Sequence, residues 1–319
     1  MIKVYGNIKP EDDYTHPLGP EENFNESVYF NFFDREQNRG GFVRMGNRAN
    51  EGYAEMTVIV YNADGSALFN YKRAKIENND GWDAGGLQVE VIVAGEELQT
   101  RYEGSAVYLT DPREMRDPSR AFKENPHKSL LVDLTHRAVG PLYGRVGDPD
   151  DGNDFARAHY EQHMRVTGQV RIGDDPPIEI RGHGLRDHSW GPRYWQSTPS
   201  YRWITGNFGD DLGMIVRTNG KGKGGGLMHK GQDLVRIKHT QIETEYEPGT
   251  RYHKALRADL ELETGETHRL EGKVMGFIPL RNRRAGNNTH IGEGMTEYTL
   301  DGERIGYGLS EYLDQPEED

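Results

Sequence analysis

The sequence has no cysteine and no long apolar run. Without cysteine, the chain cannot form disulfide bridges, Fe–S clusters or cysteine-ligated zinc sites, and it has no thiol nucleophile. No stretch approaches the roughly 18 apolar residues of a membrane-spanning helix. The N-terminal stretch MIKVYGNIKPEDDYTHP also lacks the apolar core of a signal peptide. We therefore expect a cytoplasmic protein with no membrane span.

Positive charge is also in short supply, because 39 Lys and Arg residues face 52 Asp and Glu residues, for a net charge of −13. A field of this sign repels a phosphate backbone, so we expect no nucleic-acid partner. The one basic cluster, RNRR (281–284), is interpreted as a solvated loop, with an anion site as the alternative. Phosphate-loop, dinucleotide-binding and nucleophile-elbow motifs are missing, so we expect no cofactor.

What the chain does have is glycine, aromatic residues and short alternating segments. Its 40 glycines and 15 prolines separate these segments, and amphipathic helix patterns are scarce. Period-two alternation predicts strands at 56–62, 86–95, 129–139 and 160–173, and hairpins at 254–274 and 294–313. Turns this frequent favour barrels or sandwiches. We expect an all-β protein with two antiparallel β-barrel or sandwich domains side by side, residues 1–175 and 176–319, and a ligand cleft between them or at a barrel mouth.

The segment GHGLRDHSWGPRYW (182–195) is the first candidate site. If it continues the strand that begins with IEI (178–180), alternation places His188 and Trp190 on the inward, apolar face. Asp187 then points the other way. If the strand instead breaks at its glycines, Asp187 lies beside the imidazole of His188 and raises its basicity. Two interpretations stay open, a catalytic histidine or a buried His–Asp–Arg network that only holds a corner.

The final hairpin is the second candidate. A two-residue turn at Asp301–Gly302 would place Tyr298 and Glu311 on one mostly apolar face, with Glu293 and Glu297 on the opposite face. Burial would raise the proton affinity of Glu311, which could then act as a general acid near neutral pH. The alternatives are a register slip of one residue, or an ion pair between Glu311 and an arginine.

Two further patterns are weaker. In YRWITGNFGDDLGMIVRT (201–218), Trp203 and Asp210 combine aromatic surface with an acidic group, although exposed turn aspartates are the ordinary alternative. On one strand face, His159, Glu161 and His163 would form a three-residue stripe with metal-ligating atoms. Because no established metal-binding spacing such as H-E-x-x-H occurs, we expect no metal.

The motif D-H-S-W-G (187–191), with HYEQ (159–162) and EGMTEY…GYG…EY (293–312), resembles the carotenoid 1,2-hydratase (hydroxyneurosporene synthase) and AttH-like superfamily. The resemblance implies two lipocalin-like β-barrel domains and addition or removal of water at hydrophobic alkenes without a cofactor. By position, His188 and Trp190 match the His and Trp of the D-H-x-W-G motif. Phe208 and Asp210 are an approximate counterpart of the downstream aromatic-x-Asp acid of that superfamily.

These observations together predict a cofactor-independent lyase that acts on a hydrophobic small molecule such as a terpenoid, a steroid or an aromatic compound. The acid would be Asp210, Glu311 or Asp187, and His188 would position water or take the proton back. Binding of the substrate is assigned to Trp190, Arg193, Trp195, Trp203, Tyr298 and Tyr307. The alternatives are a lipocalin-like binding protein, or an isomerase, cyclase or decarboxylase on the same scaffold. The sequence leaves a homodimer open.

Overall fold

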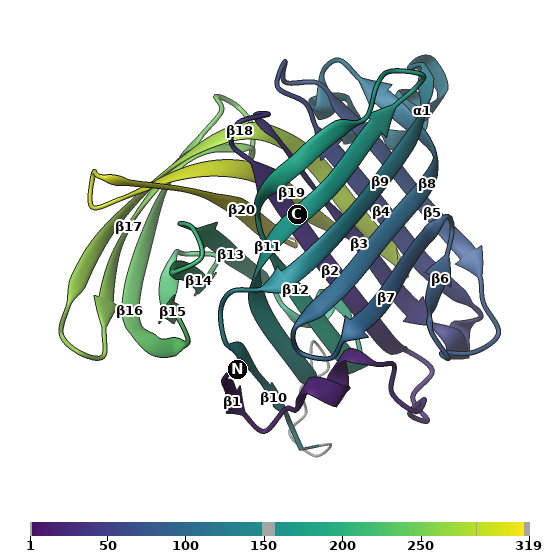
Figure 1. The fold of residues 1–319 in the computed structure, drawn as a ribbon. Coiled ribbons are helices and arrows are strands. Elements are labelled where there is room, and N and C mark those ends of the chain that lie inside the picture. Colours follow the sequence, from purple (N-terminus) through teal and green to yellow (C-terminus); the bar gives the residue numbers. More distant parts are fainter. Residues whose placement is uncertain (1, 149–156, 285, 316–319) are drawn as a thin grey trace.

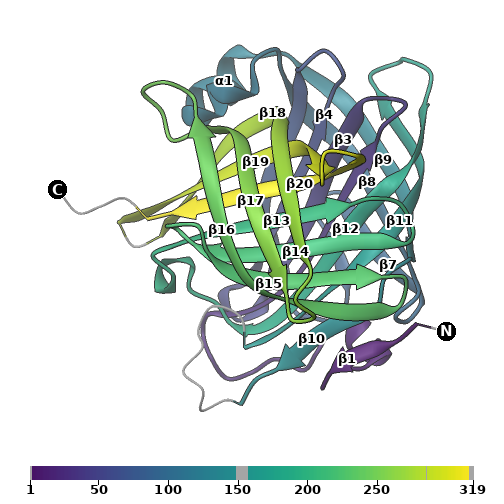
Figure 2. The same ribbon diagram turned by 90° about the vertical axis from the view of Figure 1, so that its left-hand side faces the viewer.

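The structure is a computed structural model that describes residues 2–148, 157–284 and 286–315. Two β-barrels lie side by side in it, as Figure 1 and Figure 2 show. The described residues contain one short α-helix, α1 (Pro118–Glu124), and 3-10 turns at Pro10–Asp13, Ala49–Glu51, Pro112–Arg116 and Trp195–Ser197. Among them, no helix is long and apolar enough to cross a membrane. The expected all-β architecture is confirmed.

The first barrel belongs to a twelve-stranded sheet. Its strands are β1 (Val4–Gly6), β2 (Phe24–Asp34), β3 (Arg39–Arg48), β4 (Tyr53–Tyr61), β5 (Ala67–Lys75), β6 (Trp82–Ala84), β7 (Leu87–Val93), β8 (Glu97–Leu109), β9 (His127–Ala138), β10 (Leu142–Val146), β11 (Ala158–Ile172) and β12 (Ile178–Pro192). Because β9 pairs with both β8 and β11, eight of these strands close into a ring in the order β9, β11, β12, β2, β3, β4, β5, β8. Every neighbouring pair in the ring is antiparallel.

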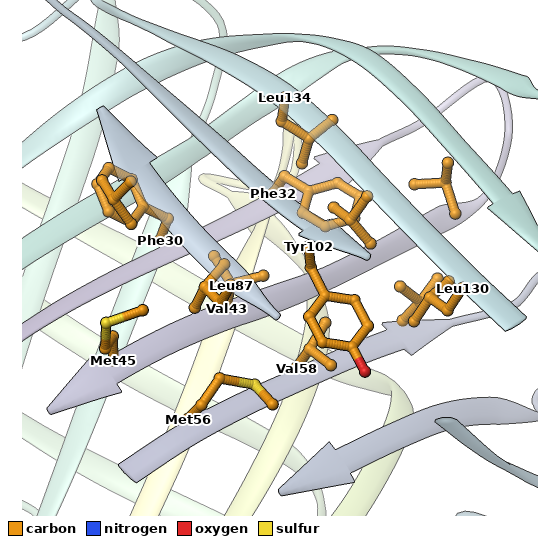
Figure 3. Packing of buried hydrophobic residues seen from close by; sticks show 14 of the residues in the cluster. Phe30, Phe32, Val43, Met45, Met56, Val58, Leu87, Tyr102, Leu130 and Leu134 are labelled. Carbon is orange, nitrogen blue, oxygen red and sulfur yellow. The ribbon is translucent and has the colours of Figure 1, made fainter. Parts of the chain in front are cut away.

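Alternation along the strands fills the inside of this ring with apolar side chains. In β4, Met56 and Val58 point inward and are fully buried, together with Val43 and Met45 of β3. Figure 3 shows these residues packed against Phe30, Phe32, Tyr102 and Leu134. Burial of each large apolar side chain contributes roughly 1.5–3 kcal/mol, so the interior of the ring is a core and not a ligand chamber.

The second barrel is closed by eight antiparallel strands. They are β13 (Ser200–Asn207), β14 (Leu212–Asn219), β15 (Lys223–Lys230), β16 (Asp233–Tyr246), β17 (His253–Leu262), β18 (Thr267–Arg284), β19 (Asn287–Leu300) and β20 (Arg304–Asp314). Its interior is also packed, with Ile204, Met214, Leu260 and Tyr298 among the buried side chains.

The change from one barrel to the other occurs between Pro192 and Ser200. The expected boundary at residue 175 falls in the turn between β11 and β12. These two strands pair with each other from Val170↔Ile178 to Ala158↔Trp190, and β12 pairs with β2 on its other side. The segment 182–192 therefore lies in the sheet of the first barrel.

In the last hairpin, the observed register differs by one residue from the expected register. Asp301 and Gly302 form the turn, with φ values of 56° and 76°, but Glu303 is left unpaired and the ladder resumes at Leu300↔Arg304. The side chain of Asp301 is held by β18, where it accepts hydrogen bonds from the Arg269 amide and from His268. The sequence pattern of the hairpin alone does not reveal this contact, because it joins the turn to a third strand. A slip of one residue moves a strand's side chains to the other face.

The two barrels pack through their outer faces. Tyr29, Phe42 and Ile59 of the first barrel meet Met295 and Leu309 of the second in one buried apolar cluster. This cluster covers only part of the contact, and the remaining space is a cavity.

Candidate active site

A cavity of about 860 Å³ lies between the two barrels. Outward-facing side chains of both barrels line it, together with residues of the 112–124 segment and Arg193, Trp195 and Thr198 from the connection between β12 and β13. The expected cleft between the two β-domains is therefore present, whereas the interiors of both barrels are filled.

Two rows of cross-strand partners form the polar wall of this cavity. The row on the second barrel crosses β19, β20, β13 and β14 and consists of Glu293, Glu311, Trp203 and Arg217. The row on the first barrel crosses β12, β2, β3 and β4 and consists of Asp187, Tyr29, Arg44 and Thr57. Directly opposed residues point to the same face of a sheet, and all eight line the cavity.

Glu293 and Glu311 form a carboxyl pair in the second row. The side chains are hydrogen-bonded to each other, and the residues are only 4% and 9% exposed. The phenol of Tyr201 donates a hydrogen bond to Glu311. Oε2 of Glu293 is buried and has no hydrogen-bond partner among the described residues.

The environment of the pair favours one retained proton. Burial raises the pKa of Glu293 well above its usual value, and the neighbouring Glu311 carboxyl raises it further. Burial also raises the pKa of Glu311, but the hydrogen bonds from Tyr201 and Glu293 oppose that effect. Two carboxyls this close share a proton because both cannot ionise cheaply. The pair can thus donate one proton and accept another, with Glu293 as the donor.

Asp187 and His159 face the pair from the first barrel. Burial alone would raise the pKa of Asp187, but the hydrogen-bonded His159 and the nearby Arg193 and Arg217 lower it below its usual value. Asp187 is therefore a carboxylate at neutral pH. Behind it, Glu161 accepts hydrogen bonds from Arg217 and from the indole of Trp203.

Cationic and aromatic groups complete the polar wall. The guanidinium groups of Arg193 and Arg44 lie 4.6 Å and 5.7 Å from the ring centroid of Trp195. Burial lowers the pKa of Arg193 to about 10, and repulsion from Arg44 contributes to the same shift. The edge of Trp203 meets the ring of Tyr29 at a centroid distance of 5.5 Å.

The whole described site falls within a recognised sequence family. A family model with the description "domain of unknown function (DUF7064)" matches residues 9–316. The chain belongs to this family. No curated protein sequence matches this DUF7064 chain.

Solved structures share the two-barrel, lipocalin-like fold of this DUF7064 chain. A protein provisionally described as AttH, from Nitrosomonas europaea, is 14% identical with a TM-score of 0.56, over 93% of this chain and 96% of its own. Kievitone hydratase from Nectria haematococca is 11% identical with a TM-score of 0.54, over 91% of this chain and 88% of its own. CghA is 11% identical with a TM-score of 0.52, over 94% and 93% of the two chains. The resemblance stated from the sequence is confirmed, and these likenesses establish the fold.

Of the ten residues assigned to catalysis or substrate binding from the sequence, five meet at the cavity, namely Asp187, Glu311, Arg193, Trp195 and Trp203. His159 and, from the basic cluster 281–284, Arg281 and Arg283 line it as well. His188 does not reach it. As expected from alternation, His188 points into the first barrel, where it is 1% exposed. There it contacts Glu26 at 3.0 Å and the Tyr160 hydroxyl at 3.0 Å, so the arrangement matches the structural interpretation of the motif.

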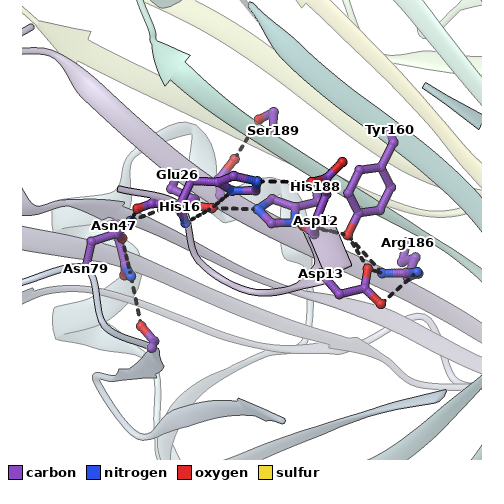
Figure 4. Close-up of polar contacts among 12 residues, drawn as sticks. Asp12, Asp13, His16, Glu26, Asn47, Asn79, Tyr160, Arg186, His188 and Ser189 are labelled. Atoms are coloured by element: carbon purple, nitrogen blue, oxygen red, sulfur yellow. Dashed lines mark hydrogen bonds and ion pairs between the residues drawn. The ribbon is translucent and has the colours of Figure 1, made fainter. Parts of the chain in front are cut away.

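The His188 network fastens the N-terminal segment to β12 (Figure 4). Glu26 accepts hydrogen bonds from the backbone and the ring of His16, and Arg186 forms a buried ion pair with Asp13. Trp190 stacks on His16 at a centroid distance of 3.8 Å and belongs to the same network. These contacts brace the strand that carries Asp187 on its other face.

The remaining predicted site residues lie elsewhere. Asp210 is at the surface, where it pairs with Arg165 and His183. Tyr298 is buried in the core of the second barrel, and Tyr307 stacks on Phe33 at 4.3 Å outside the cavity lining.

Two groups of described residues bring potential metal-ligating atoms within 4.8 Å of one another, His16–Glu26–His188 and His159–Glu161–Asp187. Both are already organised by hydrogen bonds, and the Arg217 guanidinium lies 2.7 Å from Glu161. A cation next to a ligand opposes metal binding. His163 belongs to neither group and packs against His229 instead. The absence of a metal stays a prediction.

The residues that sequence reasoning missed are Glu293, Tyr201, Tyr29 and Arg44. The expected turn register puts Glu293 on the wrong face, and the apolar alternation around Met295 and Leu309 was the signal that could have corrected it. Tyr201 meets Glu311 through the pairing of β13 with β20, which joins segments far apart in the sequence. Tyr29 and Arg44 face the carboxyl pair only because the two barrels pack against each other.

Proposed function

We propose that this protein is a cofactor-independent lyase of the hydratase or dehydratase type, and that it acts on a hydrophobic small molecule held between the barrels. The observation that carries the proposal is the Glu293–Glu311 pair, two hydrogen-bonded, buried carboxyls at the wall of a cavity that also has apolar and aromatic lining. Burial raises the pKa of both carboxyls, which favours one retained proton. Such a pair supplies an acid and a base side by side at neutral pH.

In the hydration direction, Glu293 gives its proton to one alkene carbon and a C–H bond forms. Water adds to the other carbon, a C–O bond forms, and the proton that this water loses passes to Glu311. One water is consumed, and transfer of the proton across the Glu293–Glu311 hydrogen bond restores the starting state. Dehydration runs through the same steps in reverse.

Neighbouring groups fit this chemistry. The hydrogen bond from Tyr201 stabilises Glu311 as the proton acceptor. The indole of Trp203 is the direct cross-strand partner of Glu311, and its π face can stabilise positive charge that develops on carbon. Burial of the carboxyl pair strengthens each of these interactions.

The comparisons support the proposal coarsely. Kievitone hydratase is, by its name, a hydratase, and it has the same two-barrel fold at a TM-score of 0.54. Fold likeness alone does not determine a reaction, so the assignment depends on the carboxyl pair.

The test begins with a thermal-shift screen of terpenoids, steroids and aromatic compounds, followed by incubation of each ligand in D₂O. Mass spectrometry should detect a gain or loss of water, with deuterium on carbon in the hydration direction. Glu293→Gln and Glu311→Gln should each reduce turnover by at least about a hundredfold, the lower range for a general acid or base, while ligand affinity persists.

Glu297→Gln is the matched control. Glu297 lies on the same hairpin and accepts a 2.7 Å hydrogen bond from Tyr307, but it does not line the cavity. Its substitution should leave turnover unchanged. Tight binding of a ligand with no chemistry in the wild-type protein would favour the alternative, a lipocalin-like binding protein.

A further inference from the structure

The charge of the cavity is opposite to that of the molecule. The chain carries a net charge of −13, yet seven arginines and only four carboxylate residues line the cavity. One of those four carboxyls keeps a proton if Glu293 and Glu311 share one, so the positive surplus grows. Arg73, Arg145, Arg217 and Arg283 are exposed, so water solvates much of their charge. The cations that cost free energy unless an anion offsets them are the less exposed ones.

The surplus is concentrated around Arg44. Its side chain is 16% exposed, and Nη2 is buried without a hydrogen-bond partner among the described residues. In the part of the chain that the structure describes, the one carboxylate within ion-pair distance of Arg44 is Glu55, at 3.9 Å, and Glu55 also pairs with Arg48 at 3.8 Å and Arg73 at 3.0 Å. Arg48 has a closer partner in Glu51, at 2.8 Å, so Glu55 is shared mainly between Arg73 and the more distant Arg44.

A second guanidinium lies next to Arg44. Arg193 lines the same cavity, and both groups approach the ring of Trp195. Arg44 and Arg48 both act on Arg193 by like-charge repulsion. Two guanidinium groups close to one indole and to each other form a site that suits a carboxylate or another oxyanion, which guanidinium binds through paired N–H donors.

The adjoining rows of the wall are apolar. On the first barrel, Phe42 and Phe69 lie two residues along their strands from the row that contains Arg44, which is about 7 Å. On the second barrel, Ile291 and Leu280 are opposed in the row next to Glu293. All four line the cavity, which therefore has a cationic part beside an apolar part.

We propose that the substrate of this cavity is an amphipathic anion, whose carboxylate-type group binds Arg44 and Arg193 while its apolar body lies against Phe42, Phe69, Leu280 and Ile291. This inference rests on the proposed function, since it names the substrate class of the same site. It also orients the substrate, because the carbon atoms next to the anionic group come to lie beside Glu293 and Glu311.

Two dyes with one aromatic frame test the charge preference directly. 8-Anilinonaphthalene-1-sulfonate carries a sulfonate, and N-phenyl-1-naphthylamine is the same frame without it. Fluorescence titration of the full chain should give an affinity for the sulfonate at least about tenfold higher, the scale of a hydrogen bond between charged groups. Equal affinities, or tighter binding of the neutral dye, would overturn the proposal.

The variant Arg44→Gln tests whether Arg44 causes the preference for the sulfonate dye. It should weaken sulfonate binding by about tenfold or more and leave the affinity for the neutral dye unchanged, which also shows that the cavity is intact. Arg269→Gln removes one positive charge from an exposed Asp259 pair and should alter neither affinity. If Arg44→Gln weakens both dyes alike, or neither, the anion site is not at Arg44.

The dye assay involves no turnover, so it fails or succeeds independently of the lyase proposal. Glu311→Gln should retain the preference for the sulfonate. If the glutamine variants at 293 and 311 leave turnover intact while the preference persists, the proposed chemistry is wrong and the anion site stands. If turnover depends on the pair but the two dyes bind equally well, the anion site is wrong and the chemistry stands.

Discussion

Glu293 lies directly opposite Glu311 on neighbouring strands, and the two buried carboxyls share a hydrogen bond at the wall of a cavity between the barrels. The arrangement is unfavourable for folding, because two acidic groups are removed from water at one place. Residues that lower stability in this way are typical of functional sites.

Glu293→Gln should stabilise the protein, and more so at higher pH. Burial raises the pKa of Glu293, so above about pH 4.5, the value of an unperturbed Glu, the folded state binds more protons than the unfolded state. The stability that protonation provides is complete below that pH and is lost as pH rises towards the folded-state pKa. Glutamine does not titrate and escapes this loss.

Urea unfolding at pH 5 and pH 8 measures the effect. The advantage of Glu293→Gln over the wild type should grow by on the order of 2 kcal/mol between the two, within the limit of about 1.4 kcal/mol per pH unit for one proton. Glu297→Gln should run parallel to the wild type. Parallel curves for Glu293→Gln as well would mean that the pair is ionised in the folded state.

Asp13→Asn should strongly destabilise the protein. Asp13 and Arg186 form an ion pair in which both side chains are almost completely buried, and Tyr160 donates a further hydrogen bond to Asp13. Removal of the carboxylate leaves the guanidinium buried without its counter-charge, which costs about 3–5 kcal/mol. Chemical unfolding at pH 7 measures this cost. Asp233→Asn, which breaks the exposed pair with Lys3, should leave the midpoint unchanged.

His188→Ala should lower stability without changing the chemistry of the cavity. The substitution removes one of the partners of the buried Glu26 carboxylate, whose pKa the His16 and His188 contacts lower to about 2 against the effect of burial. We expect a loss of about 2–3 kcal/mol, the cost of an incompletely bonded buried charge. Under conditions in which the variant stays folded, its ligand affinity and its turnover per folded molecule should match those of the wild type.

Asp187→Asn provides the contrast to His188→Ala. Asp187 lies one residue earlier on the opposite face of β12 and lines the cavity, so its substitution should change ligand binding or rate. Loss of turnover in His188→Ala with unchanged stability would instead restore the catalytic role that the superfamily motif implies.

Much of the fold could be predicted from alternation alone. Met56, Val58 and Val60 point inward as a period of two requires, and so do Ile180 and His188, whereas Ile59 points outward into the interface between the barrels. The sequence could not show that the ligand space lies on the outer side of the barrel wall. That depends on how much volume the inward side chains fill, and Phe30, Phe32 and Met56 leave none.

The pair to which we assign the chemistry could be predicted only in part. Glu311 was identified, but its partner depends on the unpaired Glu303 and on the contacts that hold Asp301 against β18. Arg44 and Tyr29 lie far from Glu311 in sequence and reach the cavity through the docking of two barrels. The periodicity of a single strand does not show which residues of the other barrel it will face.

The seven residues between β12 and β13 do more than join two barrels, because Arg193, Trp195 and Thr198 of this connection are themselves cavity wall. The side chain of Gln315 donates hydrogen bonds to the carbonyls of Trp195 and Thr198 and so ties the connection to the end of the second barrel. The barrels are consequently not exchangeable modules. If one barrel were grafted onto another protein, it would carry only part of the cavity wall. The complete cavity requires both barrels and the connection between them.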